Sequence, residues 1–578
     1  MVSLKKKFLK SDKVNIQYED AYNDEKVNIQ DEDAYNDDKV VSASSEIESI
    51  QLKDVLPDYD GKSFWQVPHL RRLTLVIFII SIASTNNGYD GSLFNGLFAE
   101  DKFMNVIGNV RGVVQGALSS GYPCGAFIAS FFVSYFLDKK GRKWCIVAGN
   151  LTMLFGIILQ TCSGAWIAPP DEMPGYTKRD VFGMMLCARV FCGIGVVFLA
   201  IASPALISEL SYPTYRTFCT SMFNTYWFLG AIFSSWCVYL LRNTKSHWSW
   251  RLPTLLQGIF PIIQLALTAF IPESPRFLVG QGKIEEARAL LLYHHAGNNE
   301  EVGGALVDYE LTEIQLAIEQ ERYFAQSSSY FDFVRTIPNK KRLWTLIWMA
   351  IVMQLSGVGL VSFYMGKVLD TLGYRKEDEK LLYNAIISFY NFGTATFLSL
   401  CVVSRFRRRS VLLTAIAGML LSFIVWTVLA GVGNATDFRN KSLGTAVLVI
   451  IYVFSFFSNM GTCGFPHLYV TEILPFSLRA KGMNIFCISQ TIVTLFNGFV
   501  NPLAIEAIGW KYYICYVCIG IVNLTVVYFT FVETSGRTLE EVAEVFGDGQ
   551  TSKITMKGGV INVIGHEKKP ESLYKSNV

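Results

Sequence analysis

The segment PESPRFLVGQGKIEEARALL (residues 272–291) follows directly on the apolar run GIFPIIQLALTAFI (residues 258–271). Pro272 and Pro275 should end the apolar helix, because proline cannot continue the helical hydrogen-bond ladder. The IEEARALL part then begins an amphipathic helix, whose apolar face is predicted to carry Ile284, Ala287, Leu290 and Leu291. We call the residues at which the chain leaves an apolar helix in this way a corner. The corner at PESPR (272–276) predicts a change from a membrane-spanning helix to a helix in water.

A shorter version of this corner, VETSGRTLEEV (residues 532–542), follows the last apolar run of the chain. Glu533 stands 260 positions after Glu273. An apolar helix that ends twice in a similar polar motif indicates a chain made of two related halves. Both halves would then leave the membrane on the same side.

The composition agrees with a membrane protein. Of 578 residues, 51% are hydrophobic and 17% are charged, whereas soluble domains carry about 25% charged residues. The net charge of +3 is too small to indicate a nucleic-acid partner. Cys515 and Cys518 form a CxxC pair, but they lie inside the apolar run YYICYVCIGIVNL, so we interpret them as small apolar residues rather than metal ligands.

A spanning helix needs about 20 mostly apolar residues, and twelve such runs occur. They lie at 72–94, 112–137, 144–168, 181–208, 218–241, 252–272, 344–368, 382–403, 410–432, 444–468, 482–506 and 512–532. The predicted fold class is therefore an all-α membrane protein with 12 transmembrane helices. A polar stretch at 273–343 separates six runs from six, and it should form short helices in water.

Two further pairs of polar loops repeat in the same order. DKKGRK (138–143) is followed 266 positions later by SRFRRR (404–409). ELSYPTYR (209–216) is followed 263 positions later by EILPFSLR (472–479), each with a glutamate and an arginine seven residues apart. Three landmarks at nearly one spacing indicate an internal duplication of a six-helix unit, which is typical of secondary transporters.

The basic clusters fall on one side of the predicted helices, together with the 273–343 stretch and both termini. The positive-inside rule places that side in the cytoplasm, so we expect a multi-pass protein of the cell membrane with both termini cytoplasmic. The sequon at Asn434 then lies outside and is a candidate glycosylation site. The lipid bilayer is the expected surrounding of the spanning helices.

These boundaries predict five regions. They are an N-terminal tail (1–71), a first six-helix bundle (72–272), a linker (273–343), a second six-helix bundle (344–532) and a C-terminal tail (533–578). The N-terminal tail is acidic and contains a tandem repeat, KVNIQYEDAYNDE (13–25) and KVNIQDEDAYNDD (26–38). Such a composition predicts disorder. The tails are candidate sites for ubiquitin and endocytic partners, but a solvated spacer is the favoured interpretation.

Together, these motifs resemble the sugar porter family of the major facilitator superfamily. The resemblance covers about residues 72–548 and rests on DKKGRK, Arg189 in ARVFCGIG, ELSYPTYR, PESPRFL, QLSG (354–357), EILPFSLR and ETSGRTLEE (533–541). NGYDGSLFNGL (87–97) is similar to the fungal lactose-permease-like branch. The resemblance implies a fold of two six-helix bundles and transport by alternating access.

The resemblance also implies a cytoplasmic gate in which charged residues join the two bundles while the outside is open. The matching residues are Asp138, Arg142, Glu209, Arg216, Glu273, Arg276, Glu472, Arg479, Glu533 and Arg537. Generic interfacial charges would explain each residue singly but not the repeated spacing. SRFRRR lacks the acidic residue and the glycine expected after span 8, which predicts a weaker gate in the second half.

Asp90 and Arg189 are the predicted proton-coupling pair. A charge at the centre of a helix in hydrocarbon costs about 2.5–3.5 kcal/mol, so intramembrane ions are usually paired or functional. In proton-coupled sugar porters an aspartate of span 1 pairs with this arginine, which the resemblance carries over to Asp90. The alternatives are an interfacial aspartate in a helix-ending turn and a uniporter without proton coupling.

The resemblance further places five residues at the sugar site: Asn224, Gln354, Asn391, His467 and Gln490. Hydrogen bonds between packed helices are the alternative role for each. Gly359 stands where the family usually has asparagine, and His467 where many hexose carriers have tryptophan. Loss of these two contacts leads to the hypothesis of a larger sugar, such as the disaccharides lactose or cellobiose. Phe363 and Tyr364 match an aromatic outer gate, with helix packing as the alternative.

The sequence thus predicts a sugar:proton symporter whose partners are a small sugar and a proton. A hexose facilitator, or a symporter for another polyol-like solute, is the runner-up. A sugar sensor that does not transport is a further alternative. No GxxxxGK[ST] motif occurs, which argues against an ATP-driven pump. Neither a cofactor nor a metal is expected, and neither is an enzyme activity.

Overall fold

The PESPR corner folds as its sequence predicts. Ser274 caps the N-terminus of helix α12 (Pro275–Gly280), because its side chain accepts a hydrogen bond of 3.1 Å from the backbone N–H of Phe277. Pro275 occupies the first turn, where its missing N–H is not needed. Helix α13 (Ile284–His295) follows with Ala287 and Leu291 buried, whereas Ile284, predicted on the same face, is exposed.

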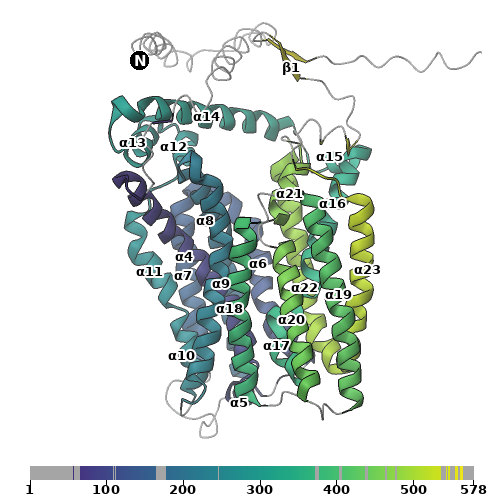
Figure 1. The fold of residues 1–578 in the computed structure, drawn as a ribbon. Coiled ribbons are helices and arrows are strands. Elements are labelled where there is room, and N and C mark those ends of the chain that lie inside the picture. The colour runs from purple at the N-terminus through teal and green to yellow at the C-terminus, as the bar shows by residue number, and fades with distance from the viewer. Residues whose placement is uncertain are drawn as a thin grey trace, which may run out of the picture. The chain divides into compact units, whose positions relative to one another are not determined.

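The computed structural model describes residues 56–57, most of 65–546, and two short strands near the C-terminus (Figure 1). The longest gap inside the helical part is 164–177. Residues 1–55, including the tandem repeat, lie outside the described residues, and so does Arg537. Residues 56–549 form one structural unit, and residues 1–55 with 550–578 form another, so each is described by itself.

The first half contains six helices or broken helices at the positions of the first six predicted spans. Their bounds are α4 (Pro68–Leu97), α6 (Gly112–Lys140), α7 (Arg142–Cys162), α8 (Lys178–Leu210), α9 (Arg216–Leu241), and the pair α10 (Trp248–Leu256) and α11 (Ile259–Leu267). The short helix α5 (Asp101–Val106) lies between α4 and α6, and short 3₁₀ turns lie at Pro213–Tyr215 and Thr268–Phe270.

The second half repeats this order after the linker helices. The linker contains α12, α13, α14 (Glu300–Ser327) and α15 (Asp332–Arg335). The spans are the pair α16 (Ile337–Leu355) and α17 (Val358–Thr371), α18 (Glu377–Cys401), α19 (Arg408–Ala435), the pair α20 (Lys441–Thr462) and α21 (Phe465–Ile473), α22 (Arg479–Ile508) and α23 (Tyr512–Thr530), with a 3₁₀ turn at Gly509–Lys511. The described part of the chain therefore has the twelve predicted spans.

Helix length and hydropathy alone identify fewer membrane spans. Eight stretches of the described residues are long and apolar enough to cross a membrane, and one of these, Lys481–Thr530, contains both α22 and α23. The helices α4, α9 and α18 are not among the eight. In α4 the polar residues Asn86, Asn87, Asp90 and Asn95 are buried, and α4 packs on α9 while α9 packs on α18. Polar spans are tolerated where protein covers them.

Span 7 is broken within the QLSG motif. Gly357 has a φ of +90°, and a Cβ at this position would lie 2.2 Å from the ring of Phe423. Only glycine combines this backbone conformation with so close an approach. Span 6 is broken at Gln257 and Gly258, between α10 and α11. Broken helices are typical of the substrate regions of transporters.

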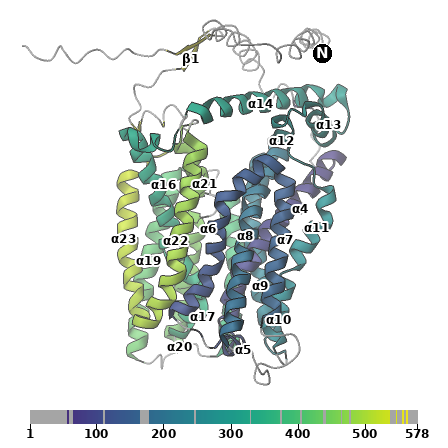
Figure 2. The ribbon, with the colours of Figure 1, turned by 180° about the vertical axis from the view of Figure 1, so that it is seen from behind.

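The two halves meet along three helix pairs: α6 with α22, α9 with α18, and α4 with α17. Figures 1 and 2 show the first half in purple to teal beside the second half in green to yellow. We call inner the helix ends that carry Arg142 and Arg408, and outer the opposite ends. The linker helix α14 has 28 residues, longer than the short helices predicted, and it lies across the inner ends in both views.

The C-terminal unit contains a β-hairpin that was not predicted from the sequence. Strand β1 (Ile554–Lys557) pairs antiparallel with β2 (Val560–Val563), with Ile554 opposite Val563. The all-α prediction therefore holds for the spans and the linker but omits this hairpin.

The linker helices have their own small core, made of Leu278, Ala287, Leu291, Ala296, Val307 and Leu311. Beside it, His295 is buried with both ring nitrogens facing acceptors. Its Nδ1 lies 2.7 Å from a carboxylate oxygen of Glu310, and its Nε2 lies 3.1 Å from the carbonyl oxygen of Leu210 at the end of α8. Two acceptors require two N–H groups, which favours the imidazolium form.

This contact predicts a pH-dependent docking of the linker. Burial alone would lower the pKa of His295, but the Glu310 carboxylate and the Leu210 carbonyl raise it overall, against the opposing charge of Arg216. The stabilisation is therefore complete below the ordinary value of 6.5 and is lost as pH rises through the folded pKa. Hydrogen exchange of residues 284–311, corrected for its intrinsic pH dependence, should be less protected at pH 9 than at pH 6.

Glu310→Gln tests the same contact. Breaking a buried ion pair costs about 3–5 kcal/mol, so this variant should lose protection in the linker already at pH 6. The neighbouring His294, whose pKa burial lowers to about 4, is the matched control: His294→Ala should keep the pH dependence. Equal protection at both pH values in the wild type would contradict the prediction.

Candidate functional site

The predicted pair Asp90 and Arg189 lies in contact inside the first half. A guanidinium nitrogen of Arg189, on α8, donates to Oδ1 of Asp90, on α4, at 2.9 Å. The side-chain amide of Gln257, in the break of span 6, donates to the same oxygen at 2.7 Å. All three residues are buried. Oδ2 of Asp90 has no hydrogen-bond partner among the described residues.

Two aromatic rings fix the arginine. Its guanidinium carbon lies 4.2 Å from the ring centre of Phe94 and 4.9 Å from that of Tyr122. Such cation–π contacts contribute about 0.5–2 kcal/mol each, the larger values when water is excluded. Arg189 is therefore held by an aspartate and two rings, and a change in the charge of Asp90 acts directly on it.

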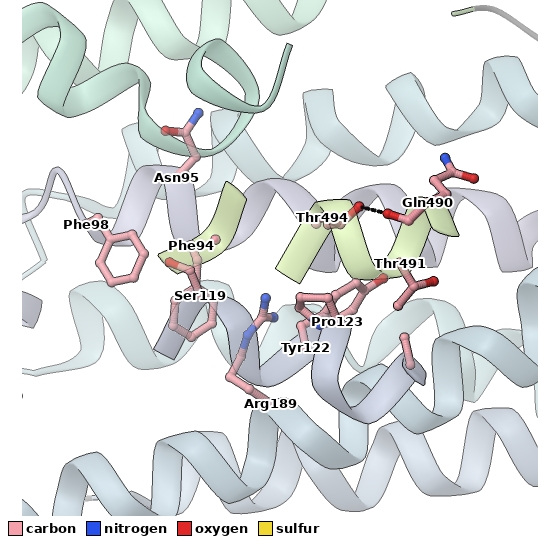
Figure 3. Close-up of a pocket in the computed structure, with 13 residues that line it drawn as sticks. Phe94, Asn95, Phe98, Ser119, Tyr122, Pro123, Arg189, Gln490, Thr491 and Thr494 are labelled. Atoms are coloured by element: carbon pink, nitrogen blue, oxygen red, sulfur yellow. Dashed lines mark hydrogen bonds between the residues drawn. The ribbon is translucent and has the colours of Figure 1, made fainter. Parts of the chain in front are cut away.

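A cavity of about 230 Å³ lies beside this arginine. Its wall combines α4, α6 and α8 of the first half with α22 of the second, so it lies between the halves (Figure 3). Aromatic and small residues line most of it, with a few polar groups, as is typical of small-molecule sites. The lining residues include Phe94, Asn95, Phe98, Ser119, Tyr122, Arg189, Gln490, Thr491 and Thr494.

Of the five residues predicted to bind sugar, only Gln490 lines this cavity. The other four lie on spanning helices outside its wall. Asn224 is exposed on α9. The backbone carbonyl oxygen of Gln354, on α16, accepts a hydrogen bond of 2.6 Å from the side-chain amide of Asn497. Asn391 accepts one of 3.1 Å from Asn459, as expected for an amide that bridges two helices.

His467, on α21, is exposed, and its ring meets that of Phe486 edge-on at 5.3 Å. It is not among the residues that line the cavity.

Several cavity residues were not predicted from the sequence. Asn95, Ser119 and Thr494 supply polar groups to the wall, and Gln257 binds Asp90. The glutamine could have been noticed as a lone amide within the run WRLPTLLQGIF (250–260). The other three carry no signal in the sequence, because small polar residues are common in spanning helices.

The outer ends of the halves are joined by polar contacts. The Asn95 amide donates to Asn384 of α18 at 2.7 Å, and its oxygen accepts from the backbone N–H of Met365 of α17 at 3.0 Å. The hydroxyls of Ser235 and Ser388 lie 2.9 Å apart. The predicted outer-gate residues Phe363 and Tyr364 are on α17, but their side chains lie outside the described residues.

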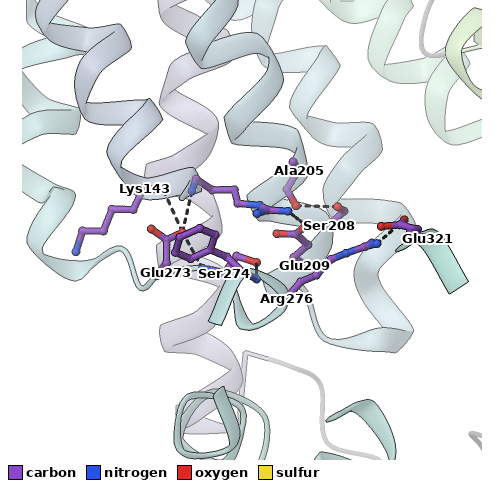
Figure 4. A network of polar contacts seen from close by, with 10 residues as sticks. Lys143, Ala205, Ser208, Glu209, Glu273, Ser274, Arg276 and Glu321 are labelled. Carbon is purple, nitrogen blue, oxygen red and sulfur yellow. Dashed lines mark hydrogen bonds and ion pairs between the residues drawn. The ribbon is translucent and has the colours of Figure 1, made fainter. Parts of the chain in front are cut away.

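At the inner end of the first half, three predicted gate residues come together (Figure 4). Arg142 pairs with Glu209 at 3.0 Å. One carboxylate oxygen of Glu273 accepts from the backbone N–H groups of Arg142 at 2.9 Å and Lys143 at 3.2 Å. Glu273 thus covers the N-terminus of α7, where the helix dipole favours a negative charge.

The second half repeats this arrangement. Glu533 accepts from the backbone N–H groups of Arg408 at 2.8 Å and Arg409 at 3.1 Å, at the N-terminus of α19. Glu472 lies 3.5 Å from the side chain of Arg408 and also accepts from the hydroxyl of Thr534. Arg408 therefore takes the place that Arg142 has in the first half, although it was not among the predicted gate residues.

Other predicted gate residues lie elsewhere. Arg276 pairs with Glu321 of α14, and Asp138 is exposed at the end of α6. Arg216 is half-buried near His295 rather than paired with Glu209. Arg479 begins α22. Glu209 and Glu273 bind partners in the first half and Glu472 and Glu533 in the second, so these four glutamates do not join the halves in this conformation.

Asn434, the candidate glycosylation site, is exposed near the end of α19. The same helix begins at Arg408, so Asn434 lies at an outer end. The candidate site thus lies at the opposite end of the helix from the basic cluster, as predicted.

The spans and the cavity between two six-helix halves are typical of a multi-pass membrane transporter. A family model described as "Sugar (and other) transporter" matches residues 76–546. The chain belongs to this family, within the major facilitator superfamily.

Its curated relatives and solved neighbours are transporters. The MFS-type transporter oryC of Aspergillus oryzae is 26% identical over 72% of this chain and 74% of its own length. A low-affinity glucose transporter of Kluyveromyces lactis is 28% identical over 71% and 70%. The inward-open structure of the xylose transporter XylE from E. coli superposes with a TM-score of 0.67 at 19% identity, over 82% of this chain and 99% of that one. This likeness concerns the fold alone.

Proposed function

We propose that the protein couples the uptake of a sugar to the entry of a proton at the plasma membrane, with both termini in the cytoplasm. One observation carries the proposal: Arg189 both binds the buried carboxylate of Asp90 and forms part of the cavity wall. A solute in the cavity and a proton on Asp90 would therefore act on the same guanidinium. Coupling requires such a shared group, because each ligand must change the binding of the other.

Alternating access would follow from the two sets of contacts between and within the halves. In this conformation Asn95, Asn384, Ser235 and Ser388 hold the outer ends together, while the four inner glutamates bind within their own halves. In the conformation that is open to the outside, these outer contacts would be broken, and the inner corners of the two halves would contact each other instead. One charge crossing 100 mV supplies about 2.3 kcal/mol, which corresponds to about fiftyfold accumulation of sugar.

The sugar itself has two candidates. Gly359 and His467, in place of the usual asparagine and tryptophan, support a disaccharide such as lactose or cellobiose. Relatives such as the glucose transporter of Kluyveromyces lactis support a hexose. A polyol-like or other solute is consistent with the wider family, which includes MFS-type transporters.

Uptake into proteoliposomes tests the proposal. With an inward proton gradient, labelled glucose, lactose, cellobiose or a polyol should accumulate, and a protonophore should abolish the accumulation. Gln490→Ala should raise the KM about 5- to 30-fold, because losing one or two hydrogen bonds costs about 1–2 kcal/mol. Asn224→Ala, outside the cavity, is the matched control and should leave KM unchanged. An increased KM in Asn224→Ala together with an unchanged KM in Gln490→Ala would place the sugar site elsewhere. A complete lack of sugar uptake by the wild type would refute the proposal.

A further inference from the structure

A buried carboxyl group at the outer end has no part in the site described above. Glu100 lies between α4 and α5 and is fully buried. Neither of its carboxyl oxygens has a hydrogen-bond partner among the described residues, although the hydroxyl of Ser249 lies beside it. A buried carboxylate without a partner is costly, and such a group tends to take up a proton instead.

Glu100 lies where the two halves meet. The preceding residue, Ala99, faces Gly366 of α17 so closely that a Cβ on this glycine would lie 3.1 Å from that of Ala99. Leu381 of α18 packs into an apolar cluster of the first half that includes Phe103 and Trp250. The second half therefore helps to cover Glu100, and separating the outer ends would expose it to water.

The charged neighbours of Glu100 come from both halves. Asp101 and Lys102 lie on α5, and Glu377 lies at the start of α18 in the second half. From α10 the facing group is the Ser249 hydroxyl. The ammonium group of Lys102 donates to the carbonyl oxygens of Arg242 at 3.2 Å and Thr244 at 2.9 Å. It is therefore shared with carbonyl groups rather than reserved for Glu100.

These surroundings favour the protonated acid. Burial raises the pKa of Glu100 to about 7; Ser249 and Lys102 lower it, while the carboxylates of Glu377 and Asp101 raise it. When the outer ends separate, Glu377 moves away and water reaches Glu100. Its pKa should then return toward the ordinary value of 4.5.

We propose that Glu100 is a second proton-binding site, separate from Asp90, through which acidity outside the membrane favours closure of the outer ends. As the ends close, the carboxylate takes a proton from the outer solution and an O–H bond forms. As they open, the proton returns to the same solution. No proton crosses the membrane at this site, so it regulates the conformation without driving transport.

The proposal rests on the two conformations of the proposed function, but not on which solute is carried. Closure should become more favourable as pH falls from about 7 toward 4.5, because only the closed form then binds the proton. The ratio of closed to open protein should rise by at most about tenfold per pH unit in this window. Below about pH 4.5 the open and the closed forms are both protonated at Glu100, so closure no longer depends on pH.

The test measures the distance between the outer ends. Spin-labelled noncanonical residues are placed at Asn243 and Ala435, two exposed positions at the outer ends of the first and second halves. The full-length protein is studied in nanodiscs without sugar and without a gradient. Between pH 8 and pH 5, the closed fraction of the wild type should rise. Glu100→Gln should remain at the acid value of the wild type throughout.

Two further variants sharpen the result. Glu377→Gln removes a repelling carboxylate from the second half, so the midpoint of closure should move to lower pH. This shift remains testable if Glu100→Gln does not fold. Asp101→Asn is the comparison variant: its carboxylate raises the pKa of Glu100 less than that of Glu377 does, so the pH response should persist with a smaller shift of its midpoint. A pH response that persists in Glu100→Gln, or that disappears in Asp90→Asn instead, would overturn the proposal.

Because no sugar is present, failure here is distinguishable from failure of sugar uptake. A protein that transports sugar but closes independently of pH would retain the proposed function and lose this inference. A protein that closes as pH falls but carries no sugar would support this inference and refute the proposed function.

Discussion

Asp90→Asn is expected to abolish accumulation of sugar against its gradient, reducing the ratio of inner to outer concentration to about one. The asparagine keeps the shape of the aspartate and an oxygen that accepts from Gln257, but it cannot exchange a proton. Arg189 would then lose its counter-charge while 5% exposed, and breaking a buried pair costs about 3–5 kcal/mol. Lower yield of the variant is therefore expected as well.

Two uptake assays distinguish coupling from general damage. Uptake driven by a proton gradient should fail in Asp90→Asn, whereas exchange of labelled for unlabelled sugar, which needs no net proton movement, should persist. Failure of both assays would mean that the ion pair is structural. Accumulation that persists in Asp90→Asn would place the coupled proton elsewhere.

Gly141→Ala should destabilise the inner corner of the first half and reduce transport strongly. Gly141 has a φ of +93°, and a Cβ there would lie 2.5 Å from Oε2 of Glu273. The substitution therefore strains the backbone, at about 1–3 kcal/mol, and displaces the carboxylate from the N-terminus of α7. A decrease of about 5 °C in the unfolding temperature of the first half is expected, since 1 kcal/mol shifts Tm by about 2–4 °C in a domain of about 150–250 residues, the size of one six-helix half.

The second half offers the matched control. Arg407 occupies the corresponding corner before α19, but its φ is −63°, which any residue adopts. Arg407→Ala changes an exposed side chain and should alter stability by no more than about 0.5 kcal/mol. Thermal unfolding and uptake measured on both variants check the prediction. Equal effects would show that the two corners are constrained in the same way.

This difference also explains why SRFRRR lacks the expected glycine. From the sequence, the missing acidic residue and the missing glycine together predicted a weaker second gate. In the structure Arg407, which takes the place of Gly141, has a negative φ, and Glu533 still binds the backbone of Arg408 and Arg409. The glycine is not needed there, and a gate strength cannot be inferred from its absence.

Burial of charge made the ion pair predictable. Asp90 and Arg189 are separated by 99 positions, but two opposite charges in apolar helices have few ways to avoid the cost of desolvation, so pairing could be expected. Gln257 could not be assigned in the same way, because an amide in a spanning helix can bind a backbone, another amide or an ion. Which of these occurs depends on the break between α10 and α11.

The sequence by itself determined the number of spans, the duplication of the halves and the polar corners that end them, because hydrophobic length and repeated spacing are properties of the chain alone. Only the tertiary structure decided which amides face the cavity, as the contrast between Gln490 and Asn391 shows. Each residue step turns a helix by about 100°, so a small change in register or a break moves an amide from a cavity wall to a helix contact. The packing of the two halves also buried Glu100, since residues distant in sequence, such as Glu377 and Leu381, complete its surroundings.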